Sequence, residues 1–129
     1  MARVTGIGGV FFKARDPEAL QAFYQEHLGL TVAPEGPVVF RWRTADDPPA
    51  PGSTVWAPFA DDTTYFGPGP ASWMVNYRVD DLDGMLAALR AAGIEVDDAV
   101  EEMPGLGRFG WAADPEGNRF ELWEPAEGR

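Results

Sequence analysis

The sequence predicts an α+β fold made of two similar halves, and three observations indicate it. Residues 10–16 (VFFKARD) resemble residues 75–81 (VNYRVDD), which reveals an internal repeat. Each copy is followed by a run of apolar residues at helical spacing, and further segments have the composition and alternation of strands. Each half therefore has the predicted order strand, helix and three strands, which gives eight strands in the chain.

In the first half, a strand that ends at Ala14 leads into a helix predicted over residues 17–27. Asp16 is a good N-cap, and Pro17 suits the first helical position because its missing N–H is not needed there. Gly29 suits the left-handed C-cap that ends many helices. The three strands predicted after this helix are residues 28–32, 38–43 and 53–59.

The second half repeats these signals. Asp81 is the predicted N-cap of a helix over residues 82–92, and Gly93 ends it. Residues 114–118 (DPEGN) have the composition of a turn between two strands. The three strands predicted after this helix are residues 92–96, 108–112 and 119–123.

The length of 129 residues fits one domain over residues 1–129. We expect a first module over about residues 5–66, a glycine- and proline-rich linker over about 67–71, and a second module over about 72–125. The residues 46–52 (DDPPAPG) form another proline-rich segment, which we expect to be a loop rather than a strand.

Composition excludes several classes of function. The formal net charge of −11 argues against a nucleic-acid partner, because such surfaces need clustered Lys and Arg. The absence of cysteine excludes disulfides, thiolate metal sites and a cysteine nucleophile. No apolar run is long enough for a signal core or a membrane span, so we expect a soluble, cytoplasmic protein with no membrane partner.

Alternation along the strands predicts one apolar face, which packs under the helices, and a second face of mixed chemistry. Open solvent or a dimer interface are alternatives for the second face, but its aromatic and methionine side chains favour a ligand pocket over an exposed apolar patch. The predicted ligand-binding residues are Phe11, Lys13, Thr54, Trp56, Met74, Asn76, Arg78, Glu121 and Trp123.

These motifs resemble the vicinal oxygen chelate superfamily, which includes glyoxalase I, extradiol dioxygenases and bleomycin-resistance proteins. The segments that carry the resemblance are residues 10–16, 22–24 (AFY), 28–30 (LGL), 79–82 (VDDL) and 114–125 (DPEGNRFELWEP). The resemblance implies two βαβββ modules, which form a cupped, mostly antiparallel eight-stranded sheet with the helices on its outer face. It also implies a homodimer, because the cups of relatives are usually completed by a partner.

The metal enzymes of this superfamily carry a histidine at the first strand of a module and a glutamate near the last strand. Carried over residue by residue, this pattern fails here, because Gly9 and Met74 stand at the histidine positions and Thr54 at one glutamate position. Glu121 alone keeps a ligand side chain, and one ligand does not hold a labile divalent ion tightly. We therefore expect no bound metal and no cofactor.

The charged residues of the second face leave several functions open. Lys13 and Arg78 occupy equivalent positions of the repeat, with Glu121 as their expected counter-charge. They form either a structural salt-bridge network or a site for an anion or a carbonyl, in which Arg78 is a bidentate donor and Trp56 and Trp123 are stacking walls.

We therefore predict a glyoxalase- or bleomycin-resistance-like protein that binds a small polar or anionic metabolite or drug. A binder of a cationic drug fits the negative charge of the chain but not the basic residues of this face. A lyase, isomerase or dioxygenase that acts on a small carbonyl or vicinal-oxygen substrate is the alternative, and Glu121 is then a weak candidate for its catalytic base.

Overall fold

The computed structural model describes residues 1–33 and 36–129. Its elements are β1 (Val4–Ala14), α1 (Pro17–Leu28), β2 (Val38–Arg43), β3 (Pro51–Ala60), β4 (Trp73–Val79), α2 (Leu82–Ala91), β5 (Glu101–Met103), β6 (Gly107–Ala113) and β7 (Arg119–Pro125). They form one seven-stranded sheet in the order β2-β3-β1-β4-β7-β6-β5. The sheet is mixed, because β1 pairs with β3 and β4 pairs with β7 in parallel while the other neighbours are antiparallel.

This architecture confirms the α+β class, with a sheet that is not closed. The strand count differs from the expected eight, because residues 28–32 and 92–96 do not form strands. Val32 and Val96 each make only an isolated bridge, to Val38 and Ala112. The short strand β5, which we did not anticipate, pairs with the start of β6 instead.

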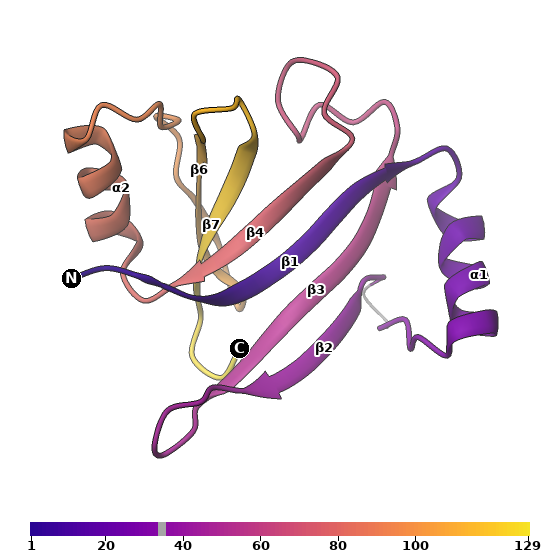
Figure 1. Ribbon diagram of the computed structural model, residues 1–129. Helices are drawn as coiled ribbons and strands as arrows, with labels where there is room; N and C mark the ends of the chain where they lie inside the picture. The colour runs from indigo at the N-terminus through magenta and orange to yellow at the C-terminus, as the bar shows by residue number, and fades with distance from the viewer. Residues whose placement is uncertain (34–35) are drawn as a thin grey trace.

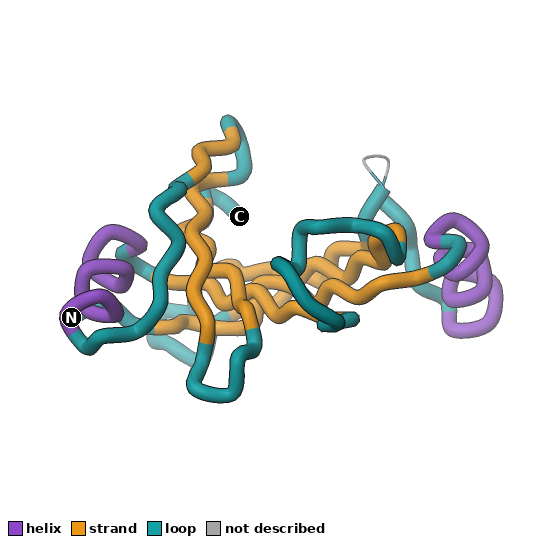
Figure 2. Tube along the Cα trace, turned by 90° about the horizontal axis from the view of Figure 1, so that it is seen from above, coloured by secondary structure: helices purple, strands orange, loops and turns teal. Residues whose placement is uncertain are grey.

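The two halves join edge to edge through their first strands. Val10 lies opposite Val75 and Phe11 opposite Met74 across the antiparallel pair β1–β4. The helices lie at opposite ends of the molecule, with the strands between them (Figures 1 and 2). In the view from above, one group of strands rises steeply out of the layer formed by the others (Figure 2).

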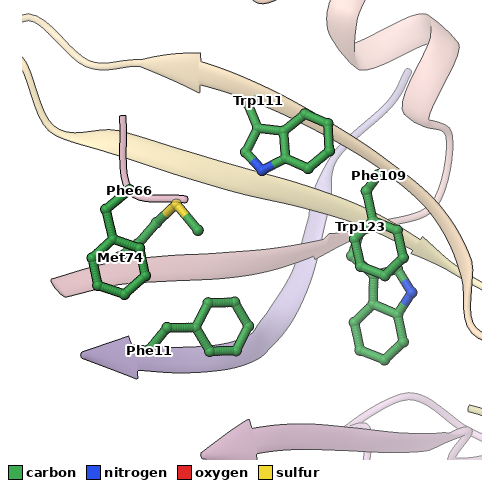
Figure 3. Packing of buried hydrophobic residues seen from close by; sticks show 6 residues of the cluster. All are labelled: Phe11, Phe66, Met74, Phe109, Trp111 and Trp123. Carbon is green, nitrogen blue, oxygen red and sulfur yellow. The ribbon is translucent and has the colours of Figure 1, made fainter. Parts of the chain in front are cut away.

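Two apolar clusters lie on opposite faces of the sheet, as the alternation of side chains requires. The outer cluster packs under α2 and contains Val79, Leu82, Leu86 and Leu122. The inner cluster contains Phe11, Phe66, Met74, Phe109, Trp111 and Trp123 (Figure 3). We call the face that carries the inner cluster the inner face, and the face under the helices the outer face.

The helix ends agree with the predicted caps. The carboxylate of Asp16 accepts a hydrogen bond from the Ala19 amide at 3.0 Å, and Asp81 accepts one from Gly84 at 3.0 Å. Gly29 has φ 73°, the left-handed conformation that glycine adopts at low cost. Within the described residues, no helix has the length and apolar character that crossing a membrane requires. The cytoplasmic location stays a prediction.

Candidate functional site

Glu121 lies at the centre of the inner face, where β4, β6 and β7 run side by side. The sheet register places its Cα beside those of Asn76 on β4 and Trp111 on β6. Asn76 Nδ2 donates to Oε1 at 2.5 Å, Trp111 Nε1 donates to Oε2 at 3.0 Å, and the Tyr65 hydroxyl also donates to Oε2. We call these four residues the Glu121 cluster.

Burial controls the protonation chemistry of this cluster. Glu121 is only 1% exposed, and this burial raises its pKa above the ordinary value, although the three donors oppose the shift. The pKa of Tyr65 is raised as well, first by burial and then by the Glu121 charge, so its hydroxyl stays protonated and donating. Three uncharged donors from different parts of the chain therefore hold the carboxyl group in place.

Arg78 lies two residues after Asn76 on β4, on the same face. Its guanidinium carbon is 5.4 Å from the centroid of the Trp42 ring and 5.0 Å from that of Trp123. Nη2 donates to the main-chain oxygen of Arg129 at 2.5 Å, and Nη1 makes long contacts of 3.4 Å with the carbonyl and hydroxyl oxygens of Ser53. The side chain is thus stacked between two indoles.

Arg78 is 7% exposed, and none of the ion pairs found among the described residues includes it. The expectation that Glu121 neutralises Arg78 and Lys13 is therefore wrong, because Glu121 is turned to Tyr65, Asn76 and Trp111. Burial lowers the pKa of Arg78, as expected for a cation that has lost water.

Two cavities border the inner face. One, of about 330 Å³, is lined by Trp42, Pro51, Arg78, Glu124 and Arg129 among others, and we call it the Arg78 cavity. The other, of about 450 Å³, is lined by Phe11, Val55, Ala57, Phe59 and residues that include Pro17 and Gln21, and we call it the Phe59 cavity.

The structure brings most of the predicted site residues onto the inner face. Met74 is fully buried there, and Lys13 lies at the margin with its Nζ 5.9 Å from the centroid of the Phe66 ring. The residues that share this face are Phe11, Lys13, Met74, Asn76, Arg78, Glu121 and Trp123.

Trp56 is a correction, because it lies on the outer face. Its ring centroid is 5.2 Å from that of Phe12 and 4.9 Å from that of Tyr24 on α1. The repeat aligns residues 54–58 with 121–125, but Val55 and not Trp56 packs against the inner cluster. In the sheet pairing, Ala57 beside Phe11 takes the place of Glu121 beside Asn76, so the alignment of these two segments is out of register by three residues. An odd shift moves a side chain to the other face.

Thr54 is the second predicted ligand-binding residue that the structure does not bring onto the inner face with the others. Its hydroxyl accepts a hydrogen bond from Trp42 Nε1 at 2.8 Å and donates one to the carbonyl oxygen of Ile7 at 2.5 Å. The Thr54 hydroxyl on β3 is therefore hydrogen-bonded to both β2 and β1, and it helps to hold the three strands together.

The inner face does not fit a divalent metal. In the parallel pairs, Glu121 lies beside Asn76, and Phe11, which matches Asn76 in the repeat, lies beside Ala57, so the residue matching Glu121 in the first half has an apolar side chain. A side-chain carbon at Gly8 would clash with Asn76 Oδ1, which leaves no room for a ligand there. No three His, Asp or Glu residues gather as a metal site in the part of the chain that the structure describes.

Sequence reasoning missed Tyr65, Trp111 and Trp42 as neighbours of the site. Trp111 had a usable signal, because it shares a face of its strand with Phe109 and lies opposite Glu121. Tyr65 lies in the loop between β3 and β4, where no periodic pattern predicts the direction of a side chain.

With this geometry in place, comparisons with known proteins define the class. The family model of the glyoxalase-like domain matches residues 9–123. The chain belongs to this glyoxalase-like family, within the vicinal oxygen chelate superfamily, as the sequence motifs indicated.

Two curated relatives illustrate the range of the family. "Putative glyoxylase CFP32" of Mycobacterium tuberculosis is 30% identical over 121 residues, which is 85% of this chain and 40% of that protein. The anthracycline biosynthesis protein DnrV of Streptomyces peucetius is 38% identical over 71 residues, which is 48% of this chain and 26% of DnrV. The chain thus spans less than half the length of these relatives.

Solved structures share the fold. Streptomyces coelicolor methylmalonyl-CoA epimerase, in complex with 2-nitronate-propionyl-CoA, superimposes with a TM-score of 0.70 at 18% identity, covering 96% of this chain and 99% of the epimerase. The epimerase of Mycobacterium tuberculosis has a TM-score of 0.59 at 21% identity, with 95% and 89% covered. At these identities the likeness is one of fold.

Proposed function

We propose that the chain binds a small polar or anionic molecule on its inner face, anchored by Arg78 and without a metal ion. The observation that supports the proposal is Arg78, which is 7% exposed, borders a cavity of about 330 Å³ and forms none of the side-chain ion pairs found within the described residues, its guanidinium contacting only oxygens of Ser53 and Arg129 there. A buried charge with no side-chain counter-charge is costly, and an anionic ligand would lower that cost.

Asp46, Asp80, Glu124 and Arg129 also line the Arg78 cavity, and main-chain amides engage two of the three carboxylates. Asp80 accepts a hydrogen bond from the amide of Arg3, and Glu124 accepts one from the amide of Leu82. Both carboxylates are thus engaged elsewhere. Stacking between Trp42 and Trp123 fixes the plane of the guanidinium, which favours a planar carboxylate as a hydrogen-bonding partner.

A thermal-shift screen with small carboxylates tests the proposal. A ligand at 100 times its dissociation constant should add about 2.7 kcal/mol to the free energy of unfolding. The Arg78→Gln variant should lose the shift, and Arg41→Gln on the exposed part of β2 is the matched control. A carboxylate shift that survives in Arg78→Gln would contradict the role of Arg78.

Metal-independence has its own measurement. Metal analysis of tag-free protein should find no stoichiometric Ni, Zn, Fe or Mn. One bound metal per chain that disappears in Glu121→Gln would overturn this part of the proposal.

We also propose a homodimer. Ile7, Val10 and Trp73, on the adjacent central strands β1 and β4, are 42%, 40% and 49% exposed, which leaves apolar surface for a partner to cover. Sedimentation that shows only a species of 14.1 kDa would contradict it.

An enzyme that acts on a small carbonyl compound is the second candidate. Burial raises the pKa of Glu121, and a higher pKa makes its carboxylate a stronger base, which favours this candidate. Deuterium incorporation from solvent next to the carbonyl of a small 2-oxo acid, lost in Glu121→Gln, would support this candidate over simple binding.

A further inference from the structure

We infer that the ligand of this site is an amphipathic carboxylic acid, whose carboxylate binds at Arg78 and whose apolar body follows β3 into the Phe59 cavity. The inference rests on the proposed function and specifies its ligand. It depends on the position of β3, which contributes residues to the lining of both cavities.

Successive residues of β3 border both cavities. Pro51 lines the Arg78 cavity, and Ser53 contacts the Arg78 guanidinium. Further along, Val55, Ala57 and Phe59 line the Phe59 cavity. Because a strand advances about 3.3 Å per residue, the four steps from Ser53 to Ala57 span about 13 Å. An extended molecule bound at Arg78 needs about this length to place its apolar end in the Phe59 cavity.

The two cavities differ sharply in chemistry. The described residues that line the Phe59 cavity are Phe11, Pro17, Gln21, Gly36, Pro37, Val55, Ala57, Pro58 and Phe59, and none of these side chains is charged. Among them, the polar side chain of Gln21 donates through Nε2 to the carbonyl oxygen of Gly36 at 2.9 Å and is therefore already engaged. This part of the lining thus suits a hydrocarbon better than a second charge.

The glycine at position 9 makes room for a wall of the Phe59 cavity. A side-chain carbon there would come within 2.8 Å of the Phe11 ring and 3.3 Å of the Val55 carbonyl oxygen. Gly9 therefore lets the Phe11 ring lie down against β1, where it forms one wall of the Phe59 cavity. The two cavities together therefore favour a ligand that is anionic at one end and apolar along the rest of its length.

A chain-length series tests the inference directly. Acetate, hexanoate and decanoate, kept below micelle-forming concentrations, are titrated into the protein by calorimetry. Full burial of a methylene group tightens binding by about fourfold, so the four extra methylenes of decanoate give at most about 250-fold over hexanoate. We expect a gain of at least about tenfold from partial burial. Arg78→Gln should weaken all three acids, and uncharged decanol should bind more weakly than decanoate.

A pair of variants on one strand locates the apolar end. Ala57→Leu fills the Phe59 cavity, so it should remove the gain from hexanoate to decanoate and leave acetate binding unchanged. Ala60→Leu, on the exposed end of β3 and outside both cavities, is the matched control and should keep the full gain.

The outcomes separate this inference from the proposed function. If acetate and hexanoate bind through Arg78 but decanoate binds no more tightly, the amphipathic ligand is wrong and the anion site stands. If no acid binds in an Arg78-dependent manner, the proposed function itself fails. The series in the unmodified protein decides between these results even if Ala57→Leu does not fold.

Discussion

Glu121 is held by uncharged donors rather than by a cation, and this has a measurable consequence. Tyr65, Asn76 and Trp111 each donate to the carboxyl group, yet burial still raises its pKa. Hydrogen bonds from uncharged groups stabilise a carboxylate less than a positive charge at the same distance. The centre of the inner face therefore binds a proton more readily than an exposed glutamate does.

The contribution of Glu121 to the stability of the protein should consequently fall as the pH rises. Between the ordinary glutamate pKa of 4.5 and the raised folded-state pKa, the native state holds a proton that the unfolded state has lost. The contribution of Glu121 to the free energy of unfolding is therefore at its maximum below pH 4.5. This contribution is lost as the pH rises through the pKa that Glu121 has in the folded state.

Denaturant unfolding of the wild type and of Glu121→Gln across this pH range measures the effect. The wild type should lose stability relative to the variant as the pH rises. Asp83 and Asp114, whose pKa values are lowered by hydrogen bonds, act in the opposite direction in both proteins and cancel in the difference. A difference that does not change with pH would show that the Glu121 pKa is not raised.

Trp56 and Trp123 illustrate what a single residue's sequence context predicts. Alternation correctly places Trp123 on the same face as Arg78. The face on which Trp56 lies depends instead on how β3 pairs with β1, and the sequence repeat does not determine this pairing.

The Trp56→Ala variant should lower the free energy of unfolding by about 2 kcal/mol through lost packing with Phe12 and Tyr24. Carboxylate binding by the folded variant should be unchanged, and a lost thermal shift would return Trp56 to the site.

Among the elements, the two helices are attached to the sheet very differently. α1 has no buried residue, whereas α2 buries Leu82 and Leu86 against the outer cluster. A helix with little buried apolar surface opens locally at low free energy.

Hydrogen exchange should therefore separate the helices. Amides of α1 should exchange at least about tenfold faster than those of α2 under native conditions. Amides of β1 and β4 at the middle of the sheet provide the slow reference. Equal protection of both helices would mean that α1 is covered in solution, for example by a partner chain.

The difference between local and long-range interactions explains which elements could be predicted from the sequence. Helix bounds follow from local caps such as Asp16, Asp81 and Gly29, so they agree with the structure to within one residue. A strand exists only through its partner, and Val32 and Val96 each find one partner residue. β5 was missed because all its residues are exposed, so no alternation marks it.

For the whole molecule, net charge opposes the proposed ligand. The chain carries a formal charge of −11, which repels an approaching anion at low ionic strength. Added salt screens this repulsion over about 8–10 Å, while the contact with buried Arg78 is screened much less.

Acetate affinity should therefore rise, by about two- to fivefold, when sodium chloride increases from about 10 to 150 mM. Calorimetric titration at both concentrations measures it. A fall in affinity with salt would indicate that exposed cations, and not Arg78, supply the binding energy.

The pairing of β1 with β4 has a consequence for any fragment of this protein. Each of these strands is flanked by one neighbour from its own half and one from the other half. A polypeptide that ended in the loop between β3 and β4 would expose the edge of β1 that normally pairs with β4. The backbone N–H and C=O groups along that edge would then lack hydrogen-bond partners. Such a piece would self-associate through that edge, so each half protects the other from aggregation.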